Sequence, residues 1–149
     1  LLAGRAGFRP FAAATLPRNE VAMAHEILKL KSVHPTRGYS HCARAGNTLY
    51  IAGQVSQDVS GKLIGRGDMA AQAHQVFTNL RNILQEAGGT LGSIVKMTTI
   101  LTHFDNIEAY RGVRNEYFSE PFPPNTLLVI GSLANKDFLI EVEAIAVLD

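Results

Sequence analysis

The stretch FLIEVEAIAVL, residues 138–148, decides the fold class. Its apolar residues alternate as in a β-strand, whose successive side chains point to opposite faces of a sheet. One face is wholly apolar and consists of Phe138, Ile140, Val142, Ala144, Ala146 and Leu148. The opposite face carries Leu139, Glu141, Glu143, Ile145 and Val147. Carboxylates between aliphatic side chains make this second face too apolar for one that meets only water, so a long strand covered on both faces is predicted.

Upstream of this strand, the sequence predicts two amphipathic helices and several shorter strands. Apolar residues recur at spacings of three and four from Asp68, a candidate N-cap, to Ala87 before a Gly-Gly stop. A second helix is predicted over Asp105–Ser119, ahead of three prolines. Strands are predicted at Glu26–Lys31, Tyr39–Arg44, Thr48–Gln54, Ile94–Leu101 and Thr126–Ile130. This order predicts an α/β or α+β domain with both helices on one face of the sheet.

The second face of the sheet needs a cover. Residues 126–130 are, like the last strand, apolar on both faces. Two helices are too few to cover both faces of a six- or seven-stranded sheet, and another subunit is the economical cover. The sequence therefore predicts a protein that associates with copies of itself.

The composition is that of one ordinary globular domain. Of 149 residues, 46% are hydrophobic and 18% charged, and the formal net charge is +1, unlike a nucleic-acid binder. No stretch approaches the roughly 20 apolar residues that span a bilayer. A lone cysteine, Cys42, favours a buried apolar role over a nucleophilic one, and a reducing compartment such as the cytoplasm.

The first 22 residues differ from the rest of the chain. Arg5, Arg9 and Arg18 precede any acidic residue. The chain has 14 basic and 13 acidic residues, so without those three arginines 11 basic residues stand against 13 acidic ones, a net charge of −2. Residues 1–22 are interpreted either as a transit-like presequence, which points to mitochondria, or as non-native residues before a start at Met23. A single domain is predicted over residues 23–149.

The predicted second helix carries arginines within its apolar stripe. At about 100° per residue, Ile107, Arg111, Arg114 and Phe118 fall in one narrow sector. The arginines either extend to the surface or pair with an acid, or at least one of them lines a pocket for an anion. Both interpretations stay open from the sequence.

Short segments along the chain match, in order and spacing, those of a known family. They are Gly38-Tyr39, GNTLYIAGQ at 46–54, Gln72, Asn79-Leu80, Ala87-Gly88, IVKMT at 94–98, PPNT at 123–126 and IEVEAIAV at 140–147. From about Ile27 to the C-terminus the chain resembles the Rid (YjgF) family of reactive-intermediate deaminases. The resemblance implies a chorismate-mutase-like fold, in which a mixed sheet carries two long helices on one face. It also implies a homotrimer around a central barrel, with a small-molecule pocket at each subunit interface.

The resemblance further implies an activity and a set of site residues. In the deaminating branch, enamine and imine products of PLP enzymes are hydrolysed to 2-oxo acids and ammonia. An arginine holds the substrate carboxylate, and a glutamate on the last strand assists the water. Glu141 matches that catalytic glutamate. The matching substrate-binding positions are Tyr39, Ala52, Gly53, Arg111, Asn125 and Leu127.

Three of these positions depart from the family's pattern. Asn125 stands where the carboxylate-binding arginine is expected, Ala52 where serine is common, and Arg111 where many members have asparagine. A carboxylate without its arginine partner loses about 1.5–3 kcal/mol. Efficient deamination is therefore not expected unless another cation enters the pocket, and Arg111 is the best candidate.

Three functions stay open from the sequence. The first is a hydrolase of imines or related small molecules with Glu141 as base, and the second is a trimer that binds a small metabolite without catalysis. The third, an endoribonuclease or translation inhibitor, is disfavoured because no aromatic and basic platform is present. No metal or cofactor is expected, because the histidines form no helical pair at metal-ligand spacing.

Overall fold

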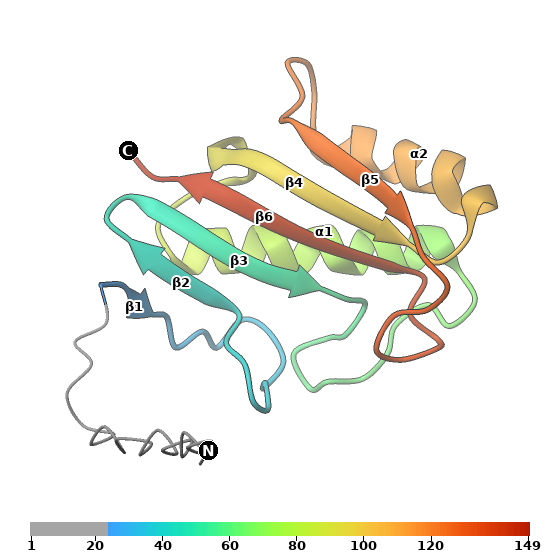
Figure 1. Cartoon of the computed structure of the whole chain (residues 1–149), viewed down its shortest axis with the longest axis horizontal. Coiled ribbons are helices and arrows are strands. Elements are labelled where there is room, and N and C mark those ends of the chain that lie inside the picture. The colour runs from blue at the N-terminus through green and yellow to red at the C-terminus, as the bar shows by residue number, and fades with distance from the viewer. Residues whose placement is uncertain (1–23) are drawn as a thin grey trace, which may run out of the picture.

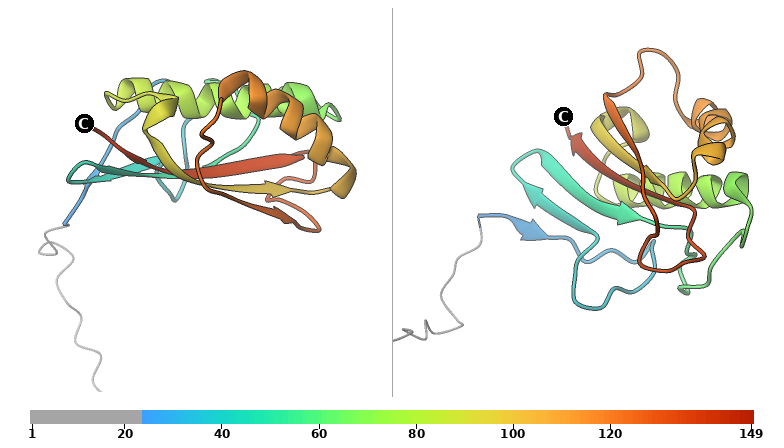
Figure 2. Two further views of the ribbon diagram at one scale, coloured as in Figure 1. Left: turned by 90° about the horizontal axis from the view of Figure 1, so that it is seen from above. Right: turned by 45° about the vertical axis from the view of Figure 1, so that its right-hand side comes forward.

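Two layers make up the fold of residues 24–149, the part of the chain that this computed structural model describes. The predicted extension over residues 1–22 lies outside these described residues. One layer is a six-stranded sheet, and the other consists of two helices that lie on the same face of the sheet (Figure 1; Figure 2, left). Within the described residues no helix covers the opposite face, which we call the open face.

The order of the strands follows from one central strand. The elements are β1 (Glu26–Ile27), β2 (Cys42–Ala45), β3 (Thr48–Gln54), α1 (Met69–Glu86), β4 (Ile94–Leu101), α2 (Ile107–Tyr117), β5 (Asn125–Val129) and β6 (Ile140–Val147). The sheet order is β1-β2-β3-β6-β4-β5. All neighbouring strands are antiparallel except β4 and β5, which are parallel. The predicted last strand therefore lies inside the sheet, between β3 and β4.

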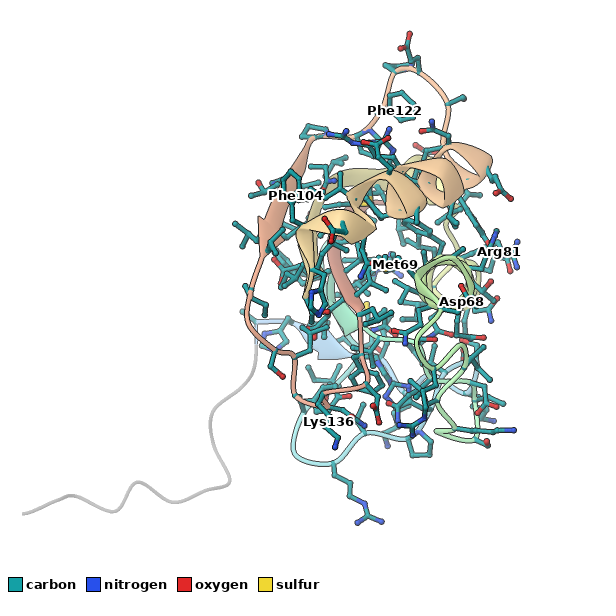
Figure 3. The ribbon with its side chains drawn as sticks, turned by 90° about the vertical axis from the view of Figure 1, so that its right-hand side faces the viewer. Asp68, Met69, Arg81, Phe104, Phe122 and Lys136 are labelled. Atoms are coloured by element: carbon teal, nitrogen blue, oxygen red, sulfur yellow. The ribbon has the colours of Figure 1, made fainter. Side chains whose placement is uncertain are left out.

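The core lies between the sheet and α1. Asp68 lies at the start of α1 (Figure 3). Its carboxylate accepts a hydrogen bond from the backbone N–H of Ala71, which caps the helix as predicted. The apolar stripe of α1 is buried, with Val76, Phe77, Leu80, Ile83 and Leu84 fully inaccessible to solvent. The even-numbered residues of β6 face this stripe, namely Ile140, Val142, Ala144 and Ala146. The predicted helix and the predicted core face of the last strand are confirmed.

Two predicted elements at the start of the domain are shorter than expected. The first strand was predicted over residues 26–31, but β1 ends at Ile27. The backbone N–H groups of Lys31 and Ser32 donate instead to the carboxylate of Glu86 on α1, at 2.9 and 3.0 Å. The second strand begins at Cys42 and not at Tyr39, whose carbonyl accepts a hydrogen bond from the Thr36 hydroxyl within a turn.

The predicted second helix is also shorter than expected. A 3₁₀ turn at Phe104–Asn106 precedes α2, and Phe118 is already extended. None of the helices in residues 24–149 is both long enough and apolar enough to cross a membrane.

The open face is apolar, as predicted. Tyr50 on β3, Leu128 on β5 and Val147 on β6 are 52%, 46% and 44% exposed. Tyr50 pairs with Ile145 and Thr48 with Val147, so the exposed apolar side chains continue from strand to strand. The helix-covered face, in contrast, presents buried residues.

Candidate functional site

A β-bulge on β3 positions the first part of the site. Ile51 pairs with Ala144 on β6, and Gln54 pairs with Val142, so β3 has one residue more than its partner over this interval. Both Ile51 and Gln54 are buried although they are three residues apart. The residues inside the bulge are Ala52 and Gly53, two of the positions predicted to bind substrate.

Gly53 lies directly against the Glu141 side chain. A Cβ atom at Gly53 would lie 1.9 Å from Oε1 of Glu141, far closer than two atoms can approach. The backbone of Gly53 does not have the left-handed conformation that itself favours glycine. Glycine is therefore required here by the position of the carboxylate.

The surroundings of Glu141 oppose its negative charge. Its side chain is half-buried on the open face of β6, and Glu143 points to the same face. Burial, and to a lesser extent the charge of Glu143, raise the pKa of Glu141. A carboxyl group with a raised pKa exchanges a proton more readily near neutral pH, which suits a general acid or base.

Tyr39 lies near this carboxylate. The residue is 52% exposed, and its hydroxyl oxygen lies 3.3 Å from Nε2 of His34. Burial and the charge of Glu141 raise the pKa of Tyr39. Tyr39, Ala52, Gly53 and Glu141 are therefore neighbours within one protomer, and we call them the Glu141 group.

Ala52 connects this group to a hollow in the open face. The hollow has a volume of about 500 Å³ and is lined by Tyr50, Ile51, Ala52, Lys96, Thr98, Glu143, Ala144 and Ile145. The ammonium of Lys96 donates to the carbonyl of Met97 and to the Thr126 hydroxyl, at 2.8 and 2.7 Å. The hollow thus combines apolar walls with one cation and one carboxylate.

Asn125 stands apart from Glu141 and is held on the helix side of the sheet. Its amide nitrogen donates to the hydroxyl of Tyr110 at 2.9 Å, and its amide oxygen accepts from the hydroxyl of Thr99 at 3.1 Å. The two hydroxyl oxygens lie 3.0 Å apart, and both residues are fully buried. Asn125 therefore belongs to a closed triangle of hydrogen bonds.

Arg111 and Leu127 lie with Asn125 on α2 and β5. The side chain of Arg111 is 53% exposed, and its guanidinium donates to Glu108 at 2.7 Å, a structural ion pair as in one of the two sequence interpretations. Leu127 packs against the core. We call Arg111, Asn125 and Leu127 the Asn125 group.

The other arginine of the predicted stripe is also held locally. The guanidinium of Arg114 stacks on Phe122, 4.7 Å from the ring centre, and donates to Asn115. Phe122 lies in the loop after α2 (Figure 3). Neither arginine of α2 is enclosed by its own protomer.

Strand β4 separates the two groups. Glu141 pairs with Ile100 of β4 on one side, and Asn125 pairs with Met97 on the other. The two positions are offset by about 10 Å across the sheet, because β4 lies between their strands, and by three residues, about 10 Å, along the strands. One protomer therefore brings Tyr39, Gly53 and Glu141 together but does not bring Asn125 to them.

Sequence reasoning missed the residues that hold these groups in place. Thr99 lies between Met97 and Leu101 on the buried face of β4, and this alternation was the available signal. His34 carries no spacing signature. Within residues 24–149 no set of three or more His, Cys, Asp or Glu side chains is arranged to hold a metal ion.

Comparison with known proteins agrees with this architecture. The family model described as Endoribonuclease L-PSP matches residues 29–148. A RutC family protein of Pyrococcus abyssi is 36% identical over 125 residues, 83% of this chain and 98% of the relative. A 2-iminobutanoate/2-iminopropanoate deaminase of Capra hircus is 34% identical over 110 residues, 73% of this chain and 79% of the relative.

A solved structure shows the same fold. The RidA protein of an Antarctic Psychrobacter species superposes with a TM-score of 0.77 at 30% identity, covering 83% of this chain and 99% of that protein. The predicted chorismate-mutase-like sheet with two helices is confirmed. The shared fold, the extent of the family match and the sequence identity together show that this chain belongs to the Rid/YjgF/RutC family.

Proposed function

We propose that this protein hydrolyses small 2-imino acids to 2-oxo acids and ammonia. The observation that carries the proposal is Glu141, a half-buried carboxylate with a raised pKa that lies against Gly53 and near Tyr39. The relative from Capra hircus carries the name of this activity. Glu141 offers the group that hydrolysis needs, since a base must take a proton from the attacking water.

The proposed reaction balances with one carboxylate as proton carrier. As the oxygen of water bonds to C2 of the iminium, Glu141 accepts one of its protons, which gives a carbinolamine. Protonated Glu141 then donates that proton to the nitrogen. The C–N bond breaks, ammonia leaves, the C2–O bond becomes a carbonyl, and the proton of the former hydroxyl passes to solvent.

We further propose that the complete pocket forms between protomers of a homotrimer. The exposed apolar side chains on the open face support association, because such a surface is costly in water. Because β5 is an edge strand of the sheet, an assembly in which the β5 edge of one protomer lies on the open face of its partner would bring the Asn125 group of the first to the Glu141 group of the second. Light scattering should give about three times the chain mass of 16.1 kDa, and a mass of one or two chains would contradict this assembly.

The state of Asn125 bears on how well such an enzyme binds a carboxylate. The amide is neutral, and Thr99 and Tyr110 already satisfy its oxygen and one of its donor positions. We propose that recognition of the substrate carboxylate depends instead on Arg111, whose side chain is half exposed. Arg111→Ala should then weaken imine hydrolysis, and the charge-conserving control Arg111→Lys should retain part of it.

The direct test measures imine decay and ammonia release with 2-iminobutanoate and 2-iminopropanoate generated in situ. We expect decay faster than in buffer, lost in Glu141→Gln. An intact trimer that does not accelerate decay but binds 2-oxobutanoate would overturn the hydrolase and support the metabolite-binding alternative. An RNA-cleavage assay on the same preparation should show no activity.

A further inference from the structure

A buried histidine supports the exposed Tyr39. His34 is 6% exposed, and its Nε2 lies 3.3 Å from the hydroxyl oxygen of Tyr39, which is 52% exposed. Both residues line a cavity of about 490 Å³ that also touches Arg37 and Gln57. The tyrosine ring is therefore open to solvent, whereas its hydroxyl contacts the protein interior.

The position of His34 is fixed through the β3 bulge. The amide nitrogen of Gln54 donates to the carbonyl of Ala52 at 2.9 Å, and the same nitrogen lies 3.1 Å from Nδ1 of His41. The bond to a carbonyl identifies this atom as the nitrogen, so it is also the donor to His41. Nδ1 of His41 is then the acceptor, and its Nε2–H donates to the backbone carbonyl of His34 at 2.7 Å. The two imidazole rings meet edge to face, with centres 4.6 Å apart. One hydrogen-bonded chain thus joins His34 to the bulge that contains Gly53.

The environment of His34 selects one tautomer. Burial and the neighbouring His41 lower the pKa of His34, so its ring is neutral near pH 7 and carries one N–H. Nδ1 is buried and has no hydrogen-bond partner among the described residues. A hydrogen on Nδ1 would be a buried donor without an acceptor, which proteins avoid more strictly than an unpaired acceptor. A hydrogen on Nε2 has the hydroxyl oxygen of Tyr39 as its acceptor.

We propose that His34 is a positioning residue that donates its Nε2–H to the Tyr39 oxygen and leaves the phenolic hydrogen free to bind the ligand. A hydroxyl that accepts one hydrogen bond donates a second more strongly. The ligand group that it suits is an oxygen acceptor, such as the carboxylate of a 2-oxo or 2-imino acid. Naming that ligand rests on the proposed function, whereas the pairing of His34 with Tyr39 does not.

The test compares His34→Gln with His34→Met. The two side chains are similar in size, but only glutamine can place an N–H near the position of Nε2. His34→Met should lower kcat/KM for 2-iminobutanoate, or weaken binding of 2-oxobutanoate, about fivefold, the effect of one neutral hydrogen bond. His34→Gln should remain within about twofold of the natural protein. In a Tyr39→Phe background the methionine change should have no further effect, and an equal loss in both backgrounds would overturn the proposal.

A second measurement needs no ligand. In protein with ¹³Cζ-labelled tyrosine, the NMR titration of Tyr39 should give a higher pKa in His34→Met than in His34→Gln, because an N–H stabilises the phenolate. Equal values would overturn the role of His34 whatever the activity. If the two variants differ in the pKa of Tyr39 as expected, but the protein neither hydrolyses imines nor binds 2-oxobutanoate, the proposed function alone is overturned. If His34→Met does not fold, His34→Asn serves in its place, since its amide is too short to reach Tyr39.

Discussion

The Glu141 group and the Asn125 group differ in how the protein treats a polar side chain. Glu141 lies in half-buried surroundings, on the same face as Glu143, that raise its pKa and so oppose its negative charge. Asn125 is neutral, and two buried hydroxyl groups satisfy it. Surroundings that disfavour the charge of a side chain lower the stability of the fold, so the presence of such a side chain points to a chemical role. A side chain whose polar groups are hydrogen-bonded is explained by the fold alone. The experiments that follow test this difference.

The largest effect is expected at Glu141. Glu141→Gln should reduce imine hydrolysis by about 100-fold or more, because the base is lost. The pKa of this carboxyl group is higher in the folded protein than in the unfolded chain. Its ionisation therefore lowers the free energy of unfolding as the pH rises above the pKa of the unfolded chain. The variant should therefore be as stable as the natural protein or more stable at pH 7, by up to about 1 kcal/mol.

Denaturant unfolding and imine decay, measured on the same preparation, check both halves of this prediction. Glu143→Gln is the matched control, since it removes a carboxylate from the same face of β6. A similar loss of activity in both variants would remove the distinction between the two glutamates.

Gly53→Ala should have the next largest effect. The added methyl would collide with Oε1 of Glu141, so the carboxylate must move. We expect a 10- to 100-fold loss of kcat/KM and a destabilisation of about 1–3 kcal/mol from overpacking. Gly46→Ala in the β2–β3 turn controls for the loss of a glycine, because nothing lies within 4 Å of its added Cβ; its positive φ makes it costly to stability but not to activity. Full activity in Gly53→Ala would show that the contact does not position the base.

Asn125→Arg addresses the other group. If the missing arginine limits carboxylate binding, the variant should gain about tenfold in kcat/KM for 2-iminobutanoate. It should also lose about 1–2 kcal/mol of stability, because Thr99 and Tyr110 lose a partner. Asn125→Ala should show the loss of stability without the gain. A folded trimeric Asn125→Arg protein with unchanged kinetics would remove position 125 from the substrate pocket.

The smallest effect concerns pH. The charge of Glu143 contributes to the raised pKa of Glu141, so Glu143→Gln should move the acid limb of the kcat/KM profile to lower pH. The rate at the optimum should change by less than about twofold, because the base itself is kept. An acid limb that does not move would show that another group controls it.

Elements with a long regular period were predicted almost to the residue. Strand β4 and helix α1 match their predicted ranges closely, because 8 and 18 residues repeat one pattern. The end of β1 could not be predicted, since it depends on a contact between Lys31 and a carboxylate 55 residues away. Local sequence carries no information about such a partner.

The candidate site was predictable to a similar extent. Tyr39, Gly53 and Glu141 came from the resemblance to a family, and the structure places them together. The direction of the Asn125 side chain could not be foreseen, because it depends on the parallel register with β4, where Asn125 shares the buried face of Met97. Its place in a pocket between protomers stays a prediction.

The bulge on β3 also makes the site separable from the scaffold. Ile51 and Gln54 already occupy positions of a regular ladder with β6, so deleting one residue between them would leave both pairings in register. Deletion of Gly53 would leave Ala52 as the single residue between these pairs and would remove the glycine against which Glu141 lies, while the buried positions of β3 stay the same. The loss of a single codon would thus leave a protein of the same shape without the contact between Gly53 and Glu141, and such a variant would separate the stability of the sheet from whatever the site does.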